Sequence, residues 1–146
     1  MNLAHWLDRT ATLLPDKPAV FLGRDPVMTY GDLLDQARRV AGGLVAHGIK
    51  PGDRVAIFMK NQPEYLVVEY AIWLMGAAIV PINAKLHAKE VEWILENAGA
   101  ALLFTSPGLT EGITADLIEV GSAAYSDLLA AAPFDGVAQK DPGDLA

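Results

Sequence analysis

The sequence predicts an α/β fold in which a layered sheet with parallel β-α-β crossovers is flanked by helices. Short, continuously apolar segments alternate with longer segments of helical periodicity, which is typical of buried parallel strands joined by helices. Glycine and proline separate these segments. With 146 residues, 52% hydrophobic and 20% charged, the chain is long enough for one domain with a sizeable core.

The first 30 residues predict a helix followed by a β-hairpin. The helix is expected over residues 2–14 and ends at Pro15, because proline cannot continue a helix. Two apolar segments then flank a turn-forming tetrapeptide, the pattern of a hairpin. These segments are AVFL (19–22), GRDP (23–26) and VMTY (27–30).

A longer helix is predicted after the hairpin and ends at Gly48. Thr29 and Asp32 have the spacing of a capping box at its start. Gly42 and Gly43 lie inside this helix, where each costs about 1 kcal/mol relative to alanine, so we expect close backbone packing against a neighbour. Its predicted core face consists of Leu33, Ala37, Val40, Ala41, Leu44 and Val45.

The most apolar stretch, residues 61–83, predicts a buried helix and strand and not a transmembrane segment. Glu69 lies near its middle, and a carboxylate at the centre of a bilayer costs about 3 kcal/mol. Pro63 suits the first turn of a helix that Gly76 ends, and AAIVPI (77–82) follows as a strand. The stretch therefore belongs to a layered α/β core.

Further strands on both sides complete two β-α-β units. DRVAIFM (53–59) follows the turn KPGD (50–53) and predicts a strand before the Pro63 helix. A second helix over residues 87–98, capped by Gly99, leads to the strand ALLFT (101–105). Crossovers of this length imply parallel strands with right-handed connections in a doubly wound sheet.

Beyond Pro107 the pattern becomes weaker. ADLIEV (115–120) predicts a short strand and SAAYSDLLAAA (122–132) a helix. Residues 134–146 are expected to leave the domain as a solvated segment.

Composition excludes several function classes. Eighteen acidic and eleven basic residues give a net charge of −7 without a basic cluster, so nucleic acid is not an expected partner. The absence of cysteine excludes disulfides, thiolate metal sites and a cysteine nucleophile. The N-terminus lacks the pattern of a signal peptide, and a cytoplasmic location is predicted.

The sequence also lacks the common catalytic motifs GxSxG, HExxH and GxxxxGK[ST]. His5, His47 and His87 have no carboxylate or second histidine at ligand spacing, which favours solvated or capping roles over metal binding or acid–base chemistry. No metal site is therefore predicted.

Two segments near predicted strand ends resemble anion sites only in part. TSPGLTEG (105–112) follows a strand but has no lysine, and its nearest charges are Glu111 and Asp116, so a surface loop is favoured over a phosphate loop. Lys60 lies beside the start of the Pro63 helix and could hold an anion, but a solvated lysine is the favoured interpretation.

Glu69 is the one carboxylate that we expect to be substantially buried. A buried carboxylate can act as an acid or base, but Glu69 has no cation, histidine or second carboxylate at helical spacing. A local hydrogen bond or a place at the helix edge is favoured. The aromatic residues Tyr65, Tyr70 and Trp73 recur at core spacing and predict packing.

Five segments, taken in order and spacing, carry a family resemblance. They are TYGDL (29–33), GIKPGDRVAI (48–57), NQPEY (61–65), GAAIVPIN (76–83) and KEVEWILENAGA (89–100). Together they make the chain closely resemble the N-terminal region of adenylate-forming (AMP-binding) enzymes, in particular acyl-CoA synthetases. His87 departs from the serine or threonine that family members often place before the last of these helices, which puts the quality of that cap in doubt.

The resemblance implies that residues 1–146 are a single, incomplete subdomain of the large N-terminal domain of the adenylate-forming fold. The phosphate loop, hinge and C-terminal domain of such enzymes would follow it. The complete enzyme would use ATP and Mg²⁺ to activate a carboxylic acid, with a fatty acid expected, as an acyl-adenylate, and would then transfer the acyl group to coenzyme A. No catalytic, cofactor-binding or metal-binding residue is expected in this chain, its substrate-binding residues are unknown, and the fragment alone is expected to be inactive.

Other interpretations stay open. The chain could be a stand-alone α/β binding or interaction module, or part of an adenylation domain that loads a carrier protein or of a luciferase-like enzyme that oxidises the adenylate. Exposed sheet surface also predicts a homodimer or other association.

Overall fold

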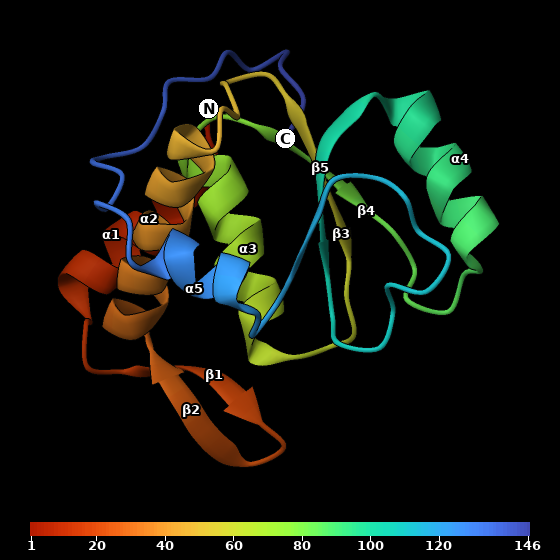
Figure 1. Cartoon of the computed structure of the whole chain (residues 1–146). Helices are drawn as coiled ribbons and strands as arrows, with labels where there is room; N and C mark the ends of the chain where they lie inside the picture. Colours follow the sequence, from red (N-terminus) through yellow and green to blue (C-terminus); the bar gives the residue numbers. More distant parts are fainter.

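The structure is a computed structural model that describes residues 1–146. From α2 to β5, helices and strands alternate along the chain (Figure 1). The elements are α1 (Ala4–Leu13), β1 (Pro18–Leu22), β2 (Asp25–Thr29), α2 (Tyr30–Ala46), β3 (Arg54–Phe58), α3 (Pro63–Leu74), β4 (Ala78–Pro81), α4 (Ala88–Ala98), β5 (Ala100–Thr105), β6 (Leu117–Glu119) and α5 (Ala123–Leu129).

The central sheet has four parallel strands in the order β4-β3-β5-β6. The crossover through α3 places β4 on one side of β3, and the crossover through α4 places β5 on the other side. The two helices therefore cover opposite faces of the sheet (Figure 1). This arrangement confirms the predicted α/β class and the two β-α-β units.

Side chains of β3 and β5 alternate between two cores. Val55, Ile57 and Phe104 face α3, in a large cluster that also contains buried residues of α1, α2 and α5. Phe58 and Leu103 face α4 in a second cluster of six buried residues. The period of two along each strand explains why these strands read as continuous apolar runs, since both faces are buried.

Helix α2 begins with the predicted capping box. The backbone N–H of Thr29 donates to Asp32 Oδ2 at 2.9 Å, and the Asp32 N–H donates to Thr29 Oγ1 at 3.1 Å. The expectation that Val45 faces the core was wrong, since its side chain is 48% exposed. Val45 lies about 100° around the helix from the buried Leu44, at the edge of the apolar stripe.

The hairpin turn is tighter than predicted. The strands end at Leu22 and resume at Asp25, so Gly23 and Arg24 alone form the loop, with Gly23 at φ 65°. Asp25 and Pro26 belong to β2. Tyr30, expected in the strand, starts α2.

The C-terminal segment is also less solvated than expected. The Phe134 N–H donates to the carbonyl of Arg38, and the Ala138 N–H donates to the carbonyl of Leu74, both at 2.8 Å. The segment crosses the helical layer towards the N-terminus (Figure 1), where the Met1 amino group donates to the carbonyl of Lys140 at 2.8 Å. None of the helices has the length and apolar character that crossing a membrane requires.

Candidate functional site

The carboxyl ends of β3, β4 and β5 meet at one edge of the sheet (Figure 1). The crossovers from β3 and from β4 lead in opposite directions, so the strand order reverses between β3 and β5. In open parallel sheets, ligands bind outside the carboxyl ends of the strands at this reversal point. The residues that follow β3 and β5 are therefore the first candidates for a functional site, and those that follow β4 lie at the same edge on the other side of β3.

A buried serine joins the exits of β3 and β5. Ser106 is 1% exposed, and its hydroxyl accepts a hydrogen bond from the Lys60 N–H at 2.9 Å. The same hydroxyl donates to Gln62 Oε1 at 2.6 Å, and Gln62 Nε2 donates to Glu64 Oε2 at 3.0 Å. This chain of hydrogen bonds fixes the Lys60 backbone and the start of α3 against the end of β5.

An open pocket of about 650 Å³ lies between the exits of β3 and β4. Its two charged residues are Lys60 and Lys85, both exposed, and no carboxylate lines it. It is lined by Met59, Lys60, Asn61, Tyr65, Pro81, Ile82, Asn83, Ala84 and Lys85. Two ammonium groups with asparagine amides and no opposing acid are suited to an anionic ligand.

Sequence analysis had identified one of the two lysines of this pocket as a candidate. Lys60 was recognised as a candidate anion ligand, although the solvated interpretation was favoured, and the structure places it at the pocket with an exposed side chain. Lys85 was missed. The indication available in the sequence was its place three residues after the strand AAIVPI, because the ends of neighbouring parallel strands lie at one edge.

Glu69 lies outside the pocket. It is half-buried, its carboxylate makes no hydrogen bond, and burial raises the pKa of that carboxyl group. Burial, and secondarily the charge of Glu69, also raises the pKa of Tyr65 and of Tyr70. Tyr70 and Trp73 contact each other edge to face, with ring centroids 5.4 Å apart, which fits the predicted packing role.

The histidines do not converge on the pocket. His47 Nε2 lies 3.3 Å from Asp116 Oδ2, a pair that sequence spacing could not reveal because 69 residues separate the two. The His87 N–H donates to Glu90 Oε2 at 2.9 Å, so a glutamate closes the helix start despite the unusual histidine. No group of three or more histidine, aspartate and glutamate side chains is placed to hold a metal ion.

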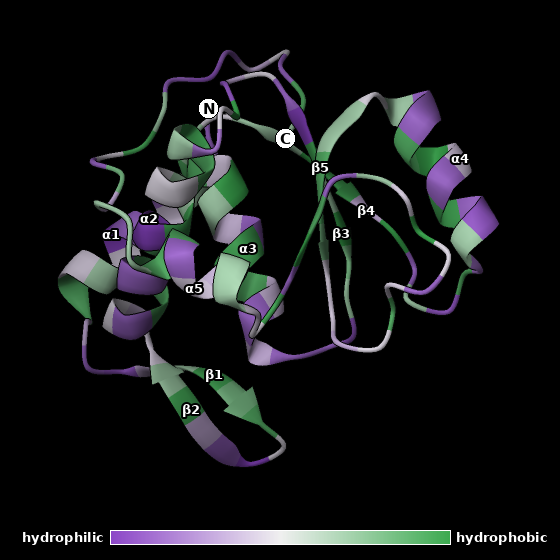
Figure 2. Cartoon of the chain, viewed as in Figure 1, coloured by the Kyte–Doolittle hydropathy of each residue, from purple (hydrophilic) through white to green (hydrophobic).

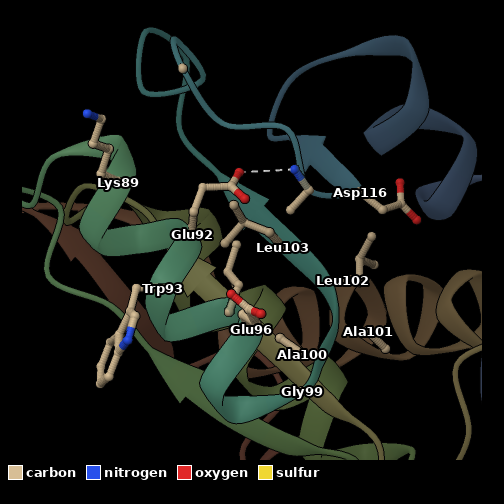
Figure 3. A pocket seen from close by; sticks show the side chains of 13 residues that line it. Lys89, Glu92, Trp93, Glu96, Gly99, Ala100, Ala101, Leu102, Leu103 and Asp116 are labelled. Carbon is tan, nitrogen blue, oxygen red and sulfur yellow. Dashed lines mark hydrogen bonds between the residues drawn. The ribbon is translucent and has the colours of Figure 1, made fainter.

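The loop TSPGLTEG leads away from the edge and over the α4 face of the sheet. Glu92 of α4 accepts hydrogen bonds from the N–H groups of Thr114 and Ala115. These bonds close the loop over an open groove of about 710 Å³, and Figure 3 shows the bond from Ala115. Glu92, Glu96 and Asp116 line this groove with a single lysine, Lys89. Its acidic character disfavours phosphate.

Comparison with known proteins decides the family. The model of the AMP-binding enzyme family matches residues 7–142. The chain belongs to the AMP-binding enzyme family. This AMP-binding family member is 37% identical over 114 residues to feruloyl-CoA synthase from Amycolatopsis, which covers 78% of the chain and 23% of the relative. It is 32% identical over 144 residues to 2-succinylbenzoate–CoA ligase from Geobacillus kaustophilus, covering 99% of the chain and 28% of that relative.

Solved structures agree with this placement. The N-terminal domain of FACL13 from Mycobacterium tuberculosis superposes with a TM-score of 0.83 at 29% identity, covering 99% of this chain and 40% of that one. A fatty acyl CoA synthetase from the same organism gives a TM-score of 0.81 at 31% identity, covering 97% and 30%. This AMP-binding family member thus has the N-terminal fold of adenylate-forming enzymes and spans about a quarter of the curated CoA ligases.

Proposed function

We propose that residues 1–146 form the N-terminal subdomain of an ATP-dependent acid–CoA ligase. The observation that carries this proposal is the 37% identity to feruloyl-CoA synthase within a family match over residues 7–142. The complete ligase would convert a carboxylate and ATP into an acyl-adenylate and pyrophosphate. The thiol of coenzyme A would then take the acyl group and release AMP. Adenylation replaces a poor leaving group by a good one, so the protein's task is to position and to stabilise charge.

The carboxyl-edge pocket fits the anionic substrates of such a ligase. ATP and coenzyme A both carry phosphates, and Lys60 and Lys85 are the cations that could hold an anionic group at this edge. The Ser106 hydrogen bonds would keep the Lys60 backbone in place during binding. We assign no catalytic residue to this chain, whose role in the ligase would be scaffold and pocket wall.

Magnesium is proposed for the complete ligase alone. The chain has no cluster of carboxylate and histidine side chains suited to the ion, so its residues do not fit a Mg²⁺ site. No step is assigned to the metal here. The cytoplasmic location and self-association through exposed surface stay predictions of the sequence.

A fatty acid is the proposed substrate. It is supported by the 31% identity to the Mycobacterium tuberculosis fatty acyl CoA synthetase, while feruloyl-CoA synthase points to aromatic acids. A second candidate function is the loading of a carrier protein. It is favoured by 39% identity over 109 residues to a plipastatin synthase from Bacillus subtilis, of which the match covers 3%.

ATP–pyrophosphate exchange tests the proposal. It would be measured on residues 1–146 and on the full-length protein that contains them, with short, medium, long and aromatic acids. Exchange in the full-length protein alone, followed by formation of an acyl-CoA thioester, is the expected result. Exchange without a thioester would favour carrier-protein loading. If the full-length protein is folded but shows no ATP–pyrophosphate exchange, the ligase proposal is refuted and a binding module is favoured.

A further inference from the structure

Helix α4 is alone on its face of the sheet, and nothing covers its outer side (Figure 1). Val91 and Leu95 of this helix are buried against the strands. Trp93 lies midway between them in the sequence, about 160° around the helix from each, so its side chain points away from the sheet. The side chain is 65% exposed, and Figure 3 shows its ring directed away from β5.

Grooves lie on both sides of the Trp93 ring. One is the open groove of about 710 Å³ beside Glu92 and Glu96. The other has a volume of about 360 Å³ and is lined by Leu86, Lys89, Glu90, Trp93 and Ile94. Trp93 is therefore a ridge between two grooves, on a helix along which hydrophilic and hydrophobic residues alternate (Figure 2). Packed helices fit the ridges of one into the grooves of the other, so this surface has the shape of a helix–helix contact.

The polar residues around Trp93 make the outer side of α4 complementary to itself. Lys89 and Glu96 lie on one side of the tryptophan, and Glu90 and Asn97 lie on the other. When two copies of this helix run antiparallel about a two-fold axis at Trp93, Lys89 of each copy comes opposite Glu96 of the other. Glu90 likewise comes opposite Asn97, whose amide can donate to a carboxylate.

The two residues of the proposed ion pair are free to form it. Lys89 and Glu96 are exposed, and neither takes part in an ion pair within the chain. A two-fold axis uses each pair twice, so a single lysine and a single glutamate provide two ion pairs. An exposed tryptophan at the centre with complementary charges around it is the usual composition of a protein–protein contact.

We infer that α4 is the surface on which a second copy of this chain docks, with the two Trp93 rings stacked at the two-fold axis and a Lys89–Glu96 ion pair on each side. The inference gives the self-association predicted from the sequence a defined surface, on a helix and not on the sheet. It goes beyond the proposed function and rests on no step of the reaction. ATP–pyrophosphate exchange in the full-length protein tests the ligase independently of this result.

The dimer is expected to be weak. Two helices of 11 residues bury less area than the roughly 1,200 Å² of a standard interface, so we expect a dissociation constant on the order of 100 μM. The net charge of −7 on each copy opposes association. Measurements therefore belong at about 0.15 M salt, where charges more than about 8 Å apart are largely screened.

Sedimentation equilibrium over a range of chain concentrations measures the association. W93S is expected to weaken it at least tenfold, because a central tryptophan contributes a large share of the binding energy. W6S is the matched control, since Trp6 is similarly exposed, at 63%, but lies on α1. Amide shifts that grow with concentration are expected at Lys89 and Trp93 and not at Trp6.

Charge reversal tests the register of the two helices. K89E and E96K are each expected to weaken the dimer about tenfold, because each puts two pairs of like charges in contact. The double variant K89E/E96K restores both ion pairs in the opposite sense and should associate within about twofold of the wild type. D127K, on the exposed side of α5, changes the net charge as E96K does and is not expected to weaken association.

The E96K variant separates this contact from general electrostatics. Because E96K reduces the negative charge of the chain, general repulsion alone would predict tighter association, whereas the Lys89–Glu96 pair predicts weaker association. The amide spectrum of each variant verifies its fold. The inference is overturned if the folded chain remains monomeric at about 1 mM. It is also overturned if W93S associates as the wild type does, or if K89E/E96K associates no more tightly than the single variants.

Discussion

The backbone N–H of Lys60 donates a hydrogen bond to the hydroxyl of Ser106, and this bond joins the exits of β3 and β5 across 2.9 Å. The hydroxyl in turn donates to Gln62 Oε1. Ser106 is nearly inaccessible to water, so its partners have no ready replacement for either bond. One side chain thereby sets the backbone geometry at the reversal point of the sheet.

Ser106→Ala is expected to lower the free energy of unfolding by about 1–3 kcal/mol, because it leaves the Lys60 N–H and the side-chain oxygen Oε1 of Gln62 unpaired. Urea unfolding followed by circular dichroism measures the change, and faster hydrogen exchange at the Lys60 amide locates it. Ser126→Ala, at an exposed position, is the control and should change stability by less than about 0.5 kcal/mol. Equal effects of the two substitutions would refute the role of Ser106.

Gly43→Ala is expected to destabilise the chain, although alanine is the better helix former. A Cβ at position 43 would lie 2.7 Å from the Cα of Leu128 in α5, closer than atoms pack. The steric cost of about 1–3 kcal/mol exceeds the roughly 1 kcal/mol that alanine gains in a helix interior. Urea unfolding measures it, with Gln36→Ala in the same helix as control. A stabilised Gly43→Ala variant would show that α2 and α5 do not pack closely.

Much of the fold could be predicted because its determinants are local. Pro63 and Gly76 mark the helix start and the turn that bound α3, and Gly76 has the positive φ of 85° that the turn requires. The two residues of the capping box, Thr29 and Asp32, are three positions apart. Such features depend on neighbours in sequence, so a single sequence contains them.

The candidate site depended on contacts that no local pattern encodes. Lys60 and Lys85 follow different strands, and Ser106 is 46 residues from the backbone that it holds. The C-terminal segment was likewise misjudged, because its hydrogen bonds to α2 and α3 run through backbone groups whose partners composition does not identify. That residues following different strands lie close together can be inferred only when the order of the strands in the sheet is known.

Glu92→Gln is expected to remove a pH-dependent restraint on the loop before β6. Hydrogen bonds from the backbone N–H of Thr114, chiefly, and of Ala115 lower the pKa of Glu92 below its ordinary 4.5. A lowered pKa in the folded state means that the stabilisation is present above pH 4.5 and is lost as the pH falls through the folded pKa. In the wild type, protection of the Thr114 and Ala115 amides from hydrogen exchange should therefore decrease on acidification.

The Glu92→Gln variant should show weaker protection that changes little over the same pH range, after correction for intrinsic exchange rates. Glu96→Gln is the matched control, since Glu96 is exposed and its carboxylate makes no hydrogen bond. In the Glu96→Gln variant, the protection of the amides at positions 114 and 115 should depend on pH as it does in the wild type. Retention of the acid-dependent loss in Glu92→Gln would assign the loop restraint to another carboxylate.

Tyr125→Phe is expected to protect the chain at alkaline pH. The Tyr125 hydroxyl is buried without a hydrogen-bond partner, and burial, with a smaller contribution from the charge of Glu64, raises its pKa far above the ordinary 10. The stabilisation from keeping this phenol protonated is complete below pH 10 and is lost as the pH rises through the folded pKa. Phenylalanine cannot ionise, so the variant escapes that loss.

At pH 7 the same substitution should be neutral or stabilising by up to about 1 kcal/mol, because it removes a buried hydroxyl that pairs with nothing. Urea unfolding at about pH 7 and about pH 11 measures both effects, with Tyr30→Phe as the control for general alkaline damage. If Tyr125→Phe loses as much stability as the wild type between these pH values, ionisation of Tyr125 does not limit alkaline stability. A loss of more than about 1 kcal/mol at neutral pH would instead reveal a partner for the hydroxyl, such as a buried water.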